Sequence, residues 1–226
     1  MNIEPIAFFR SPFSTKFGIP RQSGLVEQII GEIVLEPAYR HVEAIRGLEH
    51  FDYLWLIWEF SVNKDAVKST TVRPPRLGGN QRMGVFATRS PFRPNNLGLS
   101  CVKIQEIITD GPDAPRIKVC GADLMDGTPI YDIKPYVTYA DCYPEARSGF
   151  VDDTAWTELE VVIPERFQSV FSTEEWEGLK KVLALDPRPS YHHDPSRVYG
   201  MPFAGHDVRF RVQDNMLTVV EIIRII

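Results

Sequence analysis

Short apolar runs bounded by turn-forming residues recur along the first two thirds of the chain. They span residues 3–9, 32–35, 53–60, 83–88, 100–108, 116–122 and 129–137. Their lengths, and the imperfect alternation at 102–107, are typical of half-buried strands. In this part only residues 38–46, ending at Gly47, have a helical pattern. Successive strands without long helices between them predict a barrel or a sandwich rather than a doubly wound sheet.

The last third of the chain has a different pattern. A strand-like run at 159–163 precedes a helix that begins with the capping-box pair Ser172 and Glu175 and stops at Asp186-Pro187. Asp214-Asn215 then separates two further apolar runs, as in a hairpin. We therefore predict two domains, residues 1–144 and a small α+β subdomain at 145–226.

Positive charge is concentrated in one segment of an acidic protein. Residues 66–105 contain seven Lys or Arg and no Asp or Glu, whereas the whole chain has a formal net charge of -5, so the remainder is at -12 (-5 minus 7). Prolines and glycines between the arginines exclude a continuous helix and limit the geometries of the loop. The pattern favours an anion-binding surface, most plausibly for nucleic acid; the alternative is a solvated face or pairing with acidic residues.

Several common kinds of site are not indicated. Three widely spaced cysteines give neither a disulfide framework nor a zinc motif, and the chain lacks a P-loop, a nucleophile elbow and a Rossmann fingerprint. His192-His193-Asp194 is more typical of an exposed loop than of a metal site, so we predict no metal. The chain has no signal-like N-terminus and no apolar stretch of membrane-spanning length, which indicates a cytoplasmic protein with no membrane partner.

Three acidic residues gather at 122–136, around the turn at Asp126-Gly127. A carboxylate there could take a proton or accept ligand donors. The structural alternative is that Asp126 forms the turn and Lys134 pairs with Asp132. Spacing alone leaves both readings open.

Five unusual motifs occur in a fixed order: PRQSG at 20–24, TVRPPRLGGN at 71–80, GVFATRSPFRPN at 84–95, DGTPIYDIKPY at 126–136 and DPRPSY at 186–191. Together they resemble the TsaA/TrmO family of tRNA methyltransferases nearly end to end. The resemblance implies a mainly β protein with a single-sheeted β-barrel as its N-terminal domain, acting as an S-adenosylmethionine-dependent homodimer with the cofactor near the subunit interface. It also implies methylation of N6 of threonylcarbamoyladenosine, adenosine-37, next to the anticodon of threonine tRNA.

The same resemblance places the cofactor contacts on this chain. They would be Arg21, Gln22, Phe60, Ser61, Arg89, Leu97, Gly98, Leu99, Cys120, Gly121, Ala122 and Asp123. Relatives have His-Gln where this chain has Ser61-Val62, which leaves the side-chain role at those positions open. Asp123 and Asp126 are the candidate acceptors of the N6 proton.

The tRNA contacts are expected on basic and tyrosine side chains of the arginine-rich segment and of two later motifs. They are Arg73, Arg76, Arg82, Arg93, Lys134, Tyr136, Arg188 and Tyr191. Two rival functions remain at this level: a noncatalytic RNA-binding barrel with Tyr131, Tyr136 and Tyr191 as stacking surfaces, and a metal-dependent nucleotide hydrolase that uses the aspartates.

Overall fold

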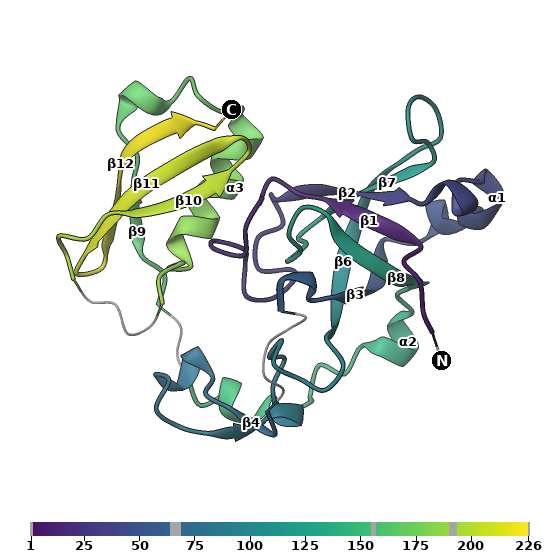
Figure 1. The fold of residues 1–226 in the computed structure, drawn as a ribbon, viewed down its shortest axis with the longest axis horizontal. Helices are drawn as coiled ribbons and strands as arrows, with labels where there is room; N and C mark the ends of the chain where they lie inside the picture. Colours follow the sequence, from purple (N-terminus) through teal and green to yellow (C-terminus); the bar gives the residue numbers. More distant parts are fainter. Residues whose placement is uncertain (1, 64–68, 155–156, 190–193, 226) are drawn as a thin grey trace.

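The chain folds into a β-barrel, a second sheet with a helix, and a small lobe. The computed structural model describes all residues except 1, 64–68, 155–156, 190–193 and 226. In Figure 1 the barrel lies on the right, the second sheet with α3 on the left, and the lobe that carries β4 below both. The predicted mainly β fold, with an N-terminal barrel and a C-terminal α+β part, is confirmed.

Six antiparallel strands close the barrel in the order β1-β2-β7-β6-β3-β8. They are β1 (Ala7–Arg10), β2 (Ile30–Leu35), β3 (Tyr53–Glu59), β6 (Leu97–Ile108), β7 (Arg116–Cys120) and β8 (Thr128–Pro135). Pairing of β1 with both β2 and β8 leaves the described sheet without a free edge, which removes the usual template for strand addition.

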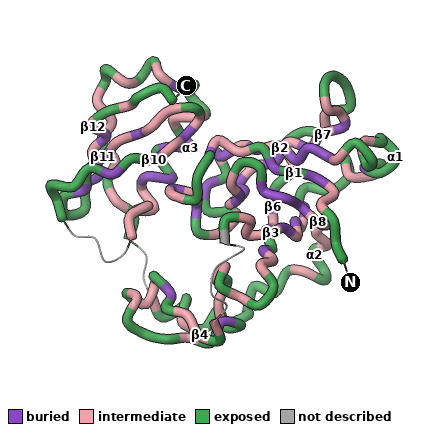
Figure 2. Tube along the Cα trace, in the orientation of Figure 1, coloured by how far each residue is buried: buried purple, intermediate pink, exposed green. Residues whose placement is uncertain are grey.

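Side-chain alternation explains how these strands make a core. In β3, Leu54, Leu56 and Trp58 are buried while the residues between them are less so. This period of two places every second side chain inside the barrel, and Figure 2 shows buried positions repeating along the barrel strands. The inner cluster consists of Ala7, Phe9, Ile33, Leu35, Ile45, Leu54, Leu56, Trp58, Val102, Ile117, Val119, Ala122, Leu124 and Ile130.

The C-terminal sheet has the order β10-β11-β12-β9. Its elements are β9 (Glu160–Val162), α3 (Thr173–Ala184), β10 (Tyr199–Phe203), β11 (His206–Gln213) and β12 (Met216–Arg224). The predicted capping box is present, since the Glu175 amide donates to Ser172 Oγ and the Ser172 amide donates to the Glu175 carboxylate. The predicted hairpin turn is present too, with Asp214 at φ +54°.

An N-terminal loop at residues 11–29 packs into the C-terminal core. Phe13, Val26 and Ile29 belong to the same buried cluster as Leu179 and Phe203. The rings of Phe13 and Phe203 meet edge-on with centroids 5.5 Å apart. The core of the C-terminal part therefore includes residues that precede the second barrel strand.

The lobe consists of a two-stranded sheet and short turns. It contains β4 (Thr71–Val72), β5 (Met83–Gly84) and the 3-10 turns η3 (Ser61–Asn63), η4 (Pro75–Leu77) and η5 (Val85–Ala87). The strand expected at 83–88 therefore covers two residues, because the chain turns into η5.

Short helices complete the chain. They are η1 (Pro37–Tyr39), α1 (Val42–Ile45), η2 (Leu48–His50), α2 (Thr138–Asp141), η6 (Gly149–Val151) and η7 (Glu165–Phe167). The single helix expected at 38–46 is split into η1 and α1. Gly47, at φ +92°, ends the helical segment as predicted but also opens η2.

Candidate active site

Three strand ends meet at one rim of the barrel. The end of β3 pairs with the start of β6 through Glu59 and Leu97, and β6 pairs with the end of β7 through Lys103 and Cys120. The Phe60 amide donates to the Asn96 carbonyl at 2.8 Å. The predicted cofactor residues at the β3–β6 end of the barrel are Phe60, Ser61, Leu97, Gly98 and Leu99. Cys120 pairs further along β6, and the segment Cys120, Gly121, Ala122 and Asp123 reaches the rim through a contact of Asp123 with Ser100.

A chain of hydrogen bonds crosses this rim. Trp58 Nε1 donates to Ser100 Oγ at 2.9 Å, and that hydroxyl donates to Asp123 Oδ1 at 2.5 Å. Ser100 is a buried polar residue at an inward position of β6, so its hydroxyl needs both partners. The bonds fix the orientation of the Asp123 carboxylate relative to the barrel interior.

Gly98 makes room for the Trp58 indole. The two residues are directly paired across β3 and β6, and a Cβ added at Gly98 would overlap the indole ring. The buried Trp58 ring also packs edge-on against Phe60, with centroids 4.4 Å apart. Glycine at this position therefore has a packing reason that is independent of any ligand.

The fold raises the pKa of the Asp123 carboxyl group, whereas it lowers the pKa of the carboxyl groups of Glu49, Asp113 and Asp194. Burial raises the pKa of Asp123, and the Ser100 hydroxyl and the positive charge of Arg89 act in the opposite direction. A desolvated carboxylate with a raised pKa takes up a proton more readily than an exposed one. Position and protonation behaviour thus both make Asp123 suited to accept a proton.

A second chain of contacts runs beside the rim. Arg89 Nη1 donates to Gln22 Oε1 at 2.6 Å, and Gln22 Nε2 donates to the Arg21 carbonyl at 2.6 Å. The loop that carries Gln22 is fixed to the barrel, because the Gly24 amide donates to the Gly121 carbonyl at 2.8 Å and Ser23 Oγ accepts from the Cys101 amide. The predicted residues Arg21 and Gln22 therefore lie on a loop attached to this rim, and Arg89, from the segment between η5 and β6, contacts that loop through Gln22.

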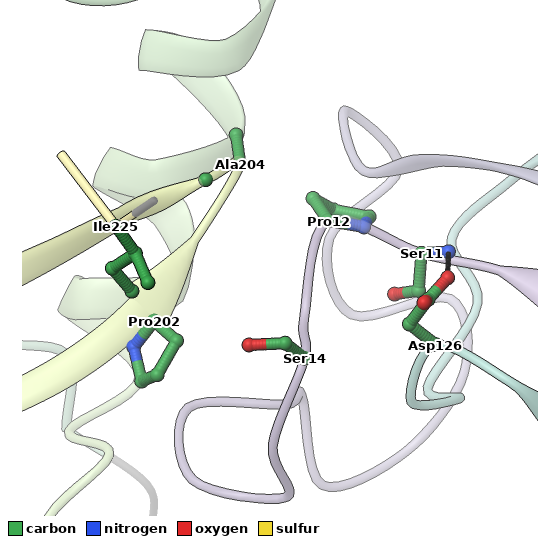
Figure 3. A pocket seen from close by; sticks show the side chains of 8 residues that line it. Ser11, Pro12, Ser14, Asp126, Pro202, Ala204 and Ile225 are labelled. Carbon is green, nitrogen blue, oxygen red and sulfur yellow. Dashed lines mark hydrogen bonds between the residues drawn. The ribbon is translucent and has the colours of Figure 1, made fainter.

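Asp126 has a different set of partners. Its Oδ1 accepts from the Ser11 amide at 3.0 Å, and its own amide donates to the Phe13 carbonyl. It lies at a hollow of about 220 Å³ whose other wall includes Pro202 and Ile225 (Figure 3). These contacts favour the turn-forming interpretation of Asp126. The expected ion pair of Lys134 with Asp132 is also present, with Lys134 Nζ 3.0 Å from Asp132 Oδ2.

The arginines of the lobe differ in their contacts. Arg73 is exposed, Arg82 donates to Thr71 Oγ1 at 3.0 Å, and Arg93 donates to the Thr88 carbonyl at 3.1 Å. Arg76 instead joins the lobe to the segment before β9, with bonds to Thr154 Oγ1 at 2.6 Å and to the carbonyls of Val151 and Thr154. Its guanidinium is thus occupied within the chain.

The other predicted tRNA residues that the structure describes belong to later parts of the chain. Tyr136 packs near Tyr53 and Trp55 on the outside of the barrel, with ring centroids 6.0 Å apart in both pairs. Arg188 forms a two-pronged ion pair with Asp186. Tyr191 lies outside the described residues, as do His192 and His193 of the weak metal motif.

Sequence reasoning missed several residues of this region. Ser100 and Trp58 were not assigned, although a serine at an inward position of a strand is a usable signal. Phe86 was not assigned either, and its 79% exposure beside an arginine-rich loop marks it as a surface aromatic. Within the described ranges, no three His, Cys, Asp or Glu side chains are arranged to hold a metal, and no helix is long and apolar enough to cross a membrane.

Comparison with known proteins identifies the family. Residues 8–142 match the tRNA-methyltransferase O N-terminal domain, and residues 158–225 match the TrmO C-terminal domain. The chain belongs to the TrmO family. A relative from Escherichia coli named tRNA (adenine(37)-N6)-methyltransferase is 40% identical over 219 residues, which is 93% of each chain.

Two further comparisons extend over the whole length. A putative S-adenosylmethionine-dependent methyltransferase of Pseudomonas aeruginosa is 39% identical over 216 residues, covering 92% of this chain and 91% of the relative. The crystal structure of TrmO from Pseudomonas aeruginosa superposes with a TM-score of 0.77 at 32% identity, covering 98% of this chain and 97% of the other. The TrmO family resemblance of the five motifs is thus confirmed, and both parts of the fold are shared.

Proposed function

We propose that this chain uses S-adenosylmethionine to methylate N6 of adenosine-37 in tRNA, and that its substrate is the threonylcarbamoylated adenosine of threonine tRNA. The observation that carries the proposal is the hydrogen-bonded Asp123 at a barrel rim that also bears Gln22 and Arg89. Membership of the TrmO family supports the reaction. Because tRNA is the substrate, the cytoplasm is the compartment in which we expect the protein to act.

The residues at the rim fit the chemistry of the proposed cofactor. S-Adenosylmethionine has a carboxylate, a positively charged sulfur and an adenine ring. Arg21 and Arg89 offer guanidinium groups for the carboxylate, Asp123 offers a negative charge, and Leu97 and Leu99 offer apolar surface for the ring. The donor set thus contains a complement for each part of the molecule.

The chain's own residues supply orientation and a proton acceptor. When bound, S-adenosylmethionine supplies a methyl group on sulfur that in-line attack by a nitrogen removes, leaving a neutral thioether. Orientation of donor and acceptor by the protein contributes roughly 7 to 11 kcal/mol at best. Asp123 takes the proton that the adenine N6 releases during attack, and Ser100 and Trp58 hold its carboxylate in place.

The tRNA surface is proposed on the lobe. Arg73, Arg82 and Arg93 lie in a segment without acidic residues, which suits contact with phosphates. Phe86 is 79% exposed in the same segment and three residues from Arg89. An exposed ring among arginines suits stacking on an unpaired base of the anticodon loop.

A homodimer is proposed through the outer face of β3, β6 and β8. Tyr53 and Leu99 are 37% and 54% exposed there, and Trp55 and Tyr136 extend the same apolar surface. Leu99 lies both on this face and at the cofactor rim. An interface centred on this surface would therefore place the cofactor site close to the second subunit.

The test is incorporation of methyl groups into defined RNA. Purified protein, S-adenosylmethionine and threonine tRNA carrying threonylcarbamoyladenosine should give one methylated nucleoside on digestion and mass spectrometry. An Asp123→Asn protein is the matched control. Thermal stabilisation by S-adenosylmethionine and S-adenosylhomocysteine, but not by magnesium with nucleotide, would distinguish this function from a metal-dependent hydrolase, and absence of methylation with retained RNA binding would indicate a noncatalytic module.

A further inference from the structure

Asp186 and Arg188 form a closed contact directly after helix α3. Arg188 donates to the two carboxylate oxygens of Asp186 through Nε at 2.8 Å and Nη2 at 2.9 Å, and its amide also donates to Oδ1 at 3.2 Å. The Arg188 side chain is 12% exposed and the Asp186 side chain is 27% exposed. A planar guanidinium bound in this two-pronged way is held in one orientation. We call this pair of residues the 186–188 clasp.

The clasp holds an unusual backbone conformation. Asp186 has φ +50°, a left-handed value that side chains other than glycine, asparagine and aspartate rarely adopt. Such a conformation persists when surrounding contacts determine it. Three hydrogen bonds from Arg188 to one carboxylate supply such contacts.

The Asp186 carbonyl in the clasp contacts the N-terminal loop at residues 11–29, which carries Arg21. Arg21 Nη2 donates to that oxygen at 3.3 Å, across 165 residues of sequence. This places a guanidinium beside the C-terminal end of α3, where backbone carbonyls give a partial negative charge. Arg21 is followed by Gln22, which accepts from Arg89 at 2.6 Å.

These contacts run from the C-terminal subdomain to the barrel rim without a gap: the clasp, Arg21, Gln22 and Arg89. We propose that Asp186 and Arg188 are positioning residues for the cofactor site, which set the place of Arg21 and through it of Gln22 and Arg89. The inference rests on the proposed function, because it takes the rim as the S-adenosylmethionine site. It replaces the expectation that Arg188 contacts tRNA, since its guanidinium is already bound to Asp186.

The experiment compares cofactor binding with tRNA binding in the full-length protein. Arg188→Ala should raise the Kd and KM for S-adenosylmethionine about tenfold, as for a lost charge-assisted hydrogen bond, and change the tRNA Kd by less than about twofold. Arg188→Lys keeps the positive charge but not the two-pronged geometry, and it should weaken S-adenosylmethionine binding nearly as much. Arg211→Ala, an exposed arginine on β11, is the control for loss of one positive charge and should change neither constant.

A double-variant cycle separates positioning from loss of folding. Asp186→Asn keeps a residue type that tolerates the left-handed turn and weakens the fork, so it should raise the cofactor KM about threefold. In the Asp186→Asn/Arg188→Ala double variant, the cofactor KM should be little higher than in Arg188→Ala alone, because both substitutions remove the same Asp186–Arg188 contact. If Arg188→Ala does not fold, the Arg188→Lys and Asp186→Asn variants test the positioning role instead, through their affinities for S-adenosylmethionine and for tRNA.

Two results would overturn the inference. One is unchanged cofactor binding in the clasp variants, and the other is a tRNA Kd that rises in Arg188→Lys while the cofactor Kd does not, which would make Arg188 a phosphate contact. Failure of the wild-type protein itself to bind S-adenosylmethionine would instead contradict the proposed function.

Discussion

Ser100 and Asp123, 23 residues apart in sequence, are joined by a 2.5 Å hydrogen bond in which the hydroxyl donates to the carboxylate. The serine lies on an inward position of β6 and the aspartate just beyond β7, so the bond spans two neighbouring strands at the rim. It counteracts part of the effect of burial, which raises the pKa of Asp123. A carboxylate that is oriented and partly desolvated is the central chemical feature of this site.

Replacing Asp123 by Asn should separate activity from stability. Asn keeps an acceptor for the Ser100 hydroxyl but cannot take a proton, so kcat should fall about 100-fold or more. The protein should remain at least as stable at neutral pH, because the variant removes a carboxylate whose charged form the fold disfavours. Steady-state kinetics measure kcat, and thermal melts measure stability. A lower melting temperature at neutral pH together with lost activity would mean that Asp123 has a structural role.

The pH dependence of both quantities follows from the raised pKa. Because the native state favours protonated Asp123, the wild-type protein gains stability relative to Asp123→Asn at low pH and loses that gain as pH rises through the native pKa. Activity has the opposite dependence and needs the ionised form. We expect kcat/KM to decline on the acid side at a pH above about 4, the usual pKa of an aspartate. A decline at or below that value would indicate an unperturbed group.

Gly98→Ala should disturb the rim through packing alone. The new methyl group would overlap the Trp58 indole, which also donates to Ser100. Overpacking of this kind costs about 1–3 kcal/mol of unfolding free energy. Gly84→Ala is the matched control, since a Cβ there meets no atom within 4 Å and the backbone is not left-handed, so its melting curve should be nearly unchanged. Equal effects of the two substitutions would refute the packing explanation.

Cofactor and tRNA contacts should be separable within the arginine-rich segment at residues 66–105. Arg89→Ala removes the partner of Gln22 and should weaken S-adenosylmethionine binding more than tRNA binding. Arg73→Ala and Phe86→Ala should do the reverse, with a loss of about 1–3 kcal/mol for a stacked base at Phe86. Tyr39→Ala, at 43% exposure on η1, is the aromatic control. Calorimetry measures S-adenosylmethionine affinity, and gel shifts measure tRNA affinity. Equal losses of both affinities in all of these variants would contradict the separation of cofactor contacts from tRNA contacts.

The proposed dimer can be tested at a residue outside the cofactor rim. Light scattering of the wild-type protein should give about twice the 25.8 kDa chain mass. Tyr53→Glu adds a charge to the proposed interface and should shift the protein toward monomer, whereas Val42→Glu, at an exposed apolar residue of α1, should not. A wild-type monomer with full activity would exclude the dimer as a requirement.

Features determined by neighbouring residues could be predicted from the sequence. The capping box at Ser172 and Glu175 and the hairpin turn at Asp214 need contacts within a few residues, and both are present. The alternation in β3 likewise reflects a local period. The strand expected at 83–88 failed because two residues pair with β4 before the chain turns into η5.

Contacts between distant residues were beyond the sequence patterns. Arg76 and Arg188 were both expected to contact tRNA, and the structure adds internal partners that the sequence did not indicate: Thr154, 78 residues away, for Arg76, and Asp186 for Arg188. Nothing in the composition of a basic loop indicates which guanidinium finds an internal partner. The same holds for Ser100, whose role depends on the register that places it beside Asp123.

The most direct test of the account is nucleoside mass spectrometry on a pair of threonine tRNAs, one with and one without the threonylcarbamoyl group. Both should bind within about tenfold, since phosphate contacts supply most of the affinity. Wild-type protein with S-adenosylmethionine should convert threonylcarbamoyladenosine to its N6-methyl form far faster than it methylates plain adenosine, and Asp123→Asn should convert threonylcarbamoyladenosine about 100-fold more slowly than wild type or slower still. Equal rates on the two tRNAs would contradict the assigned substrate, and full activity of Asp123→Asn would contradict the role of the carboxylate.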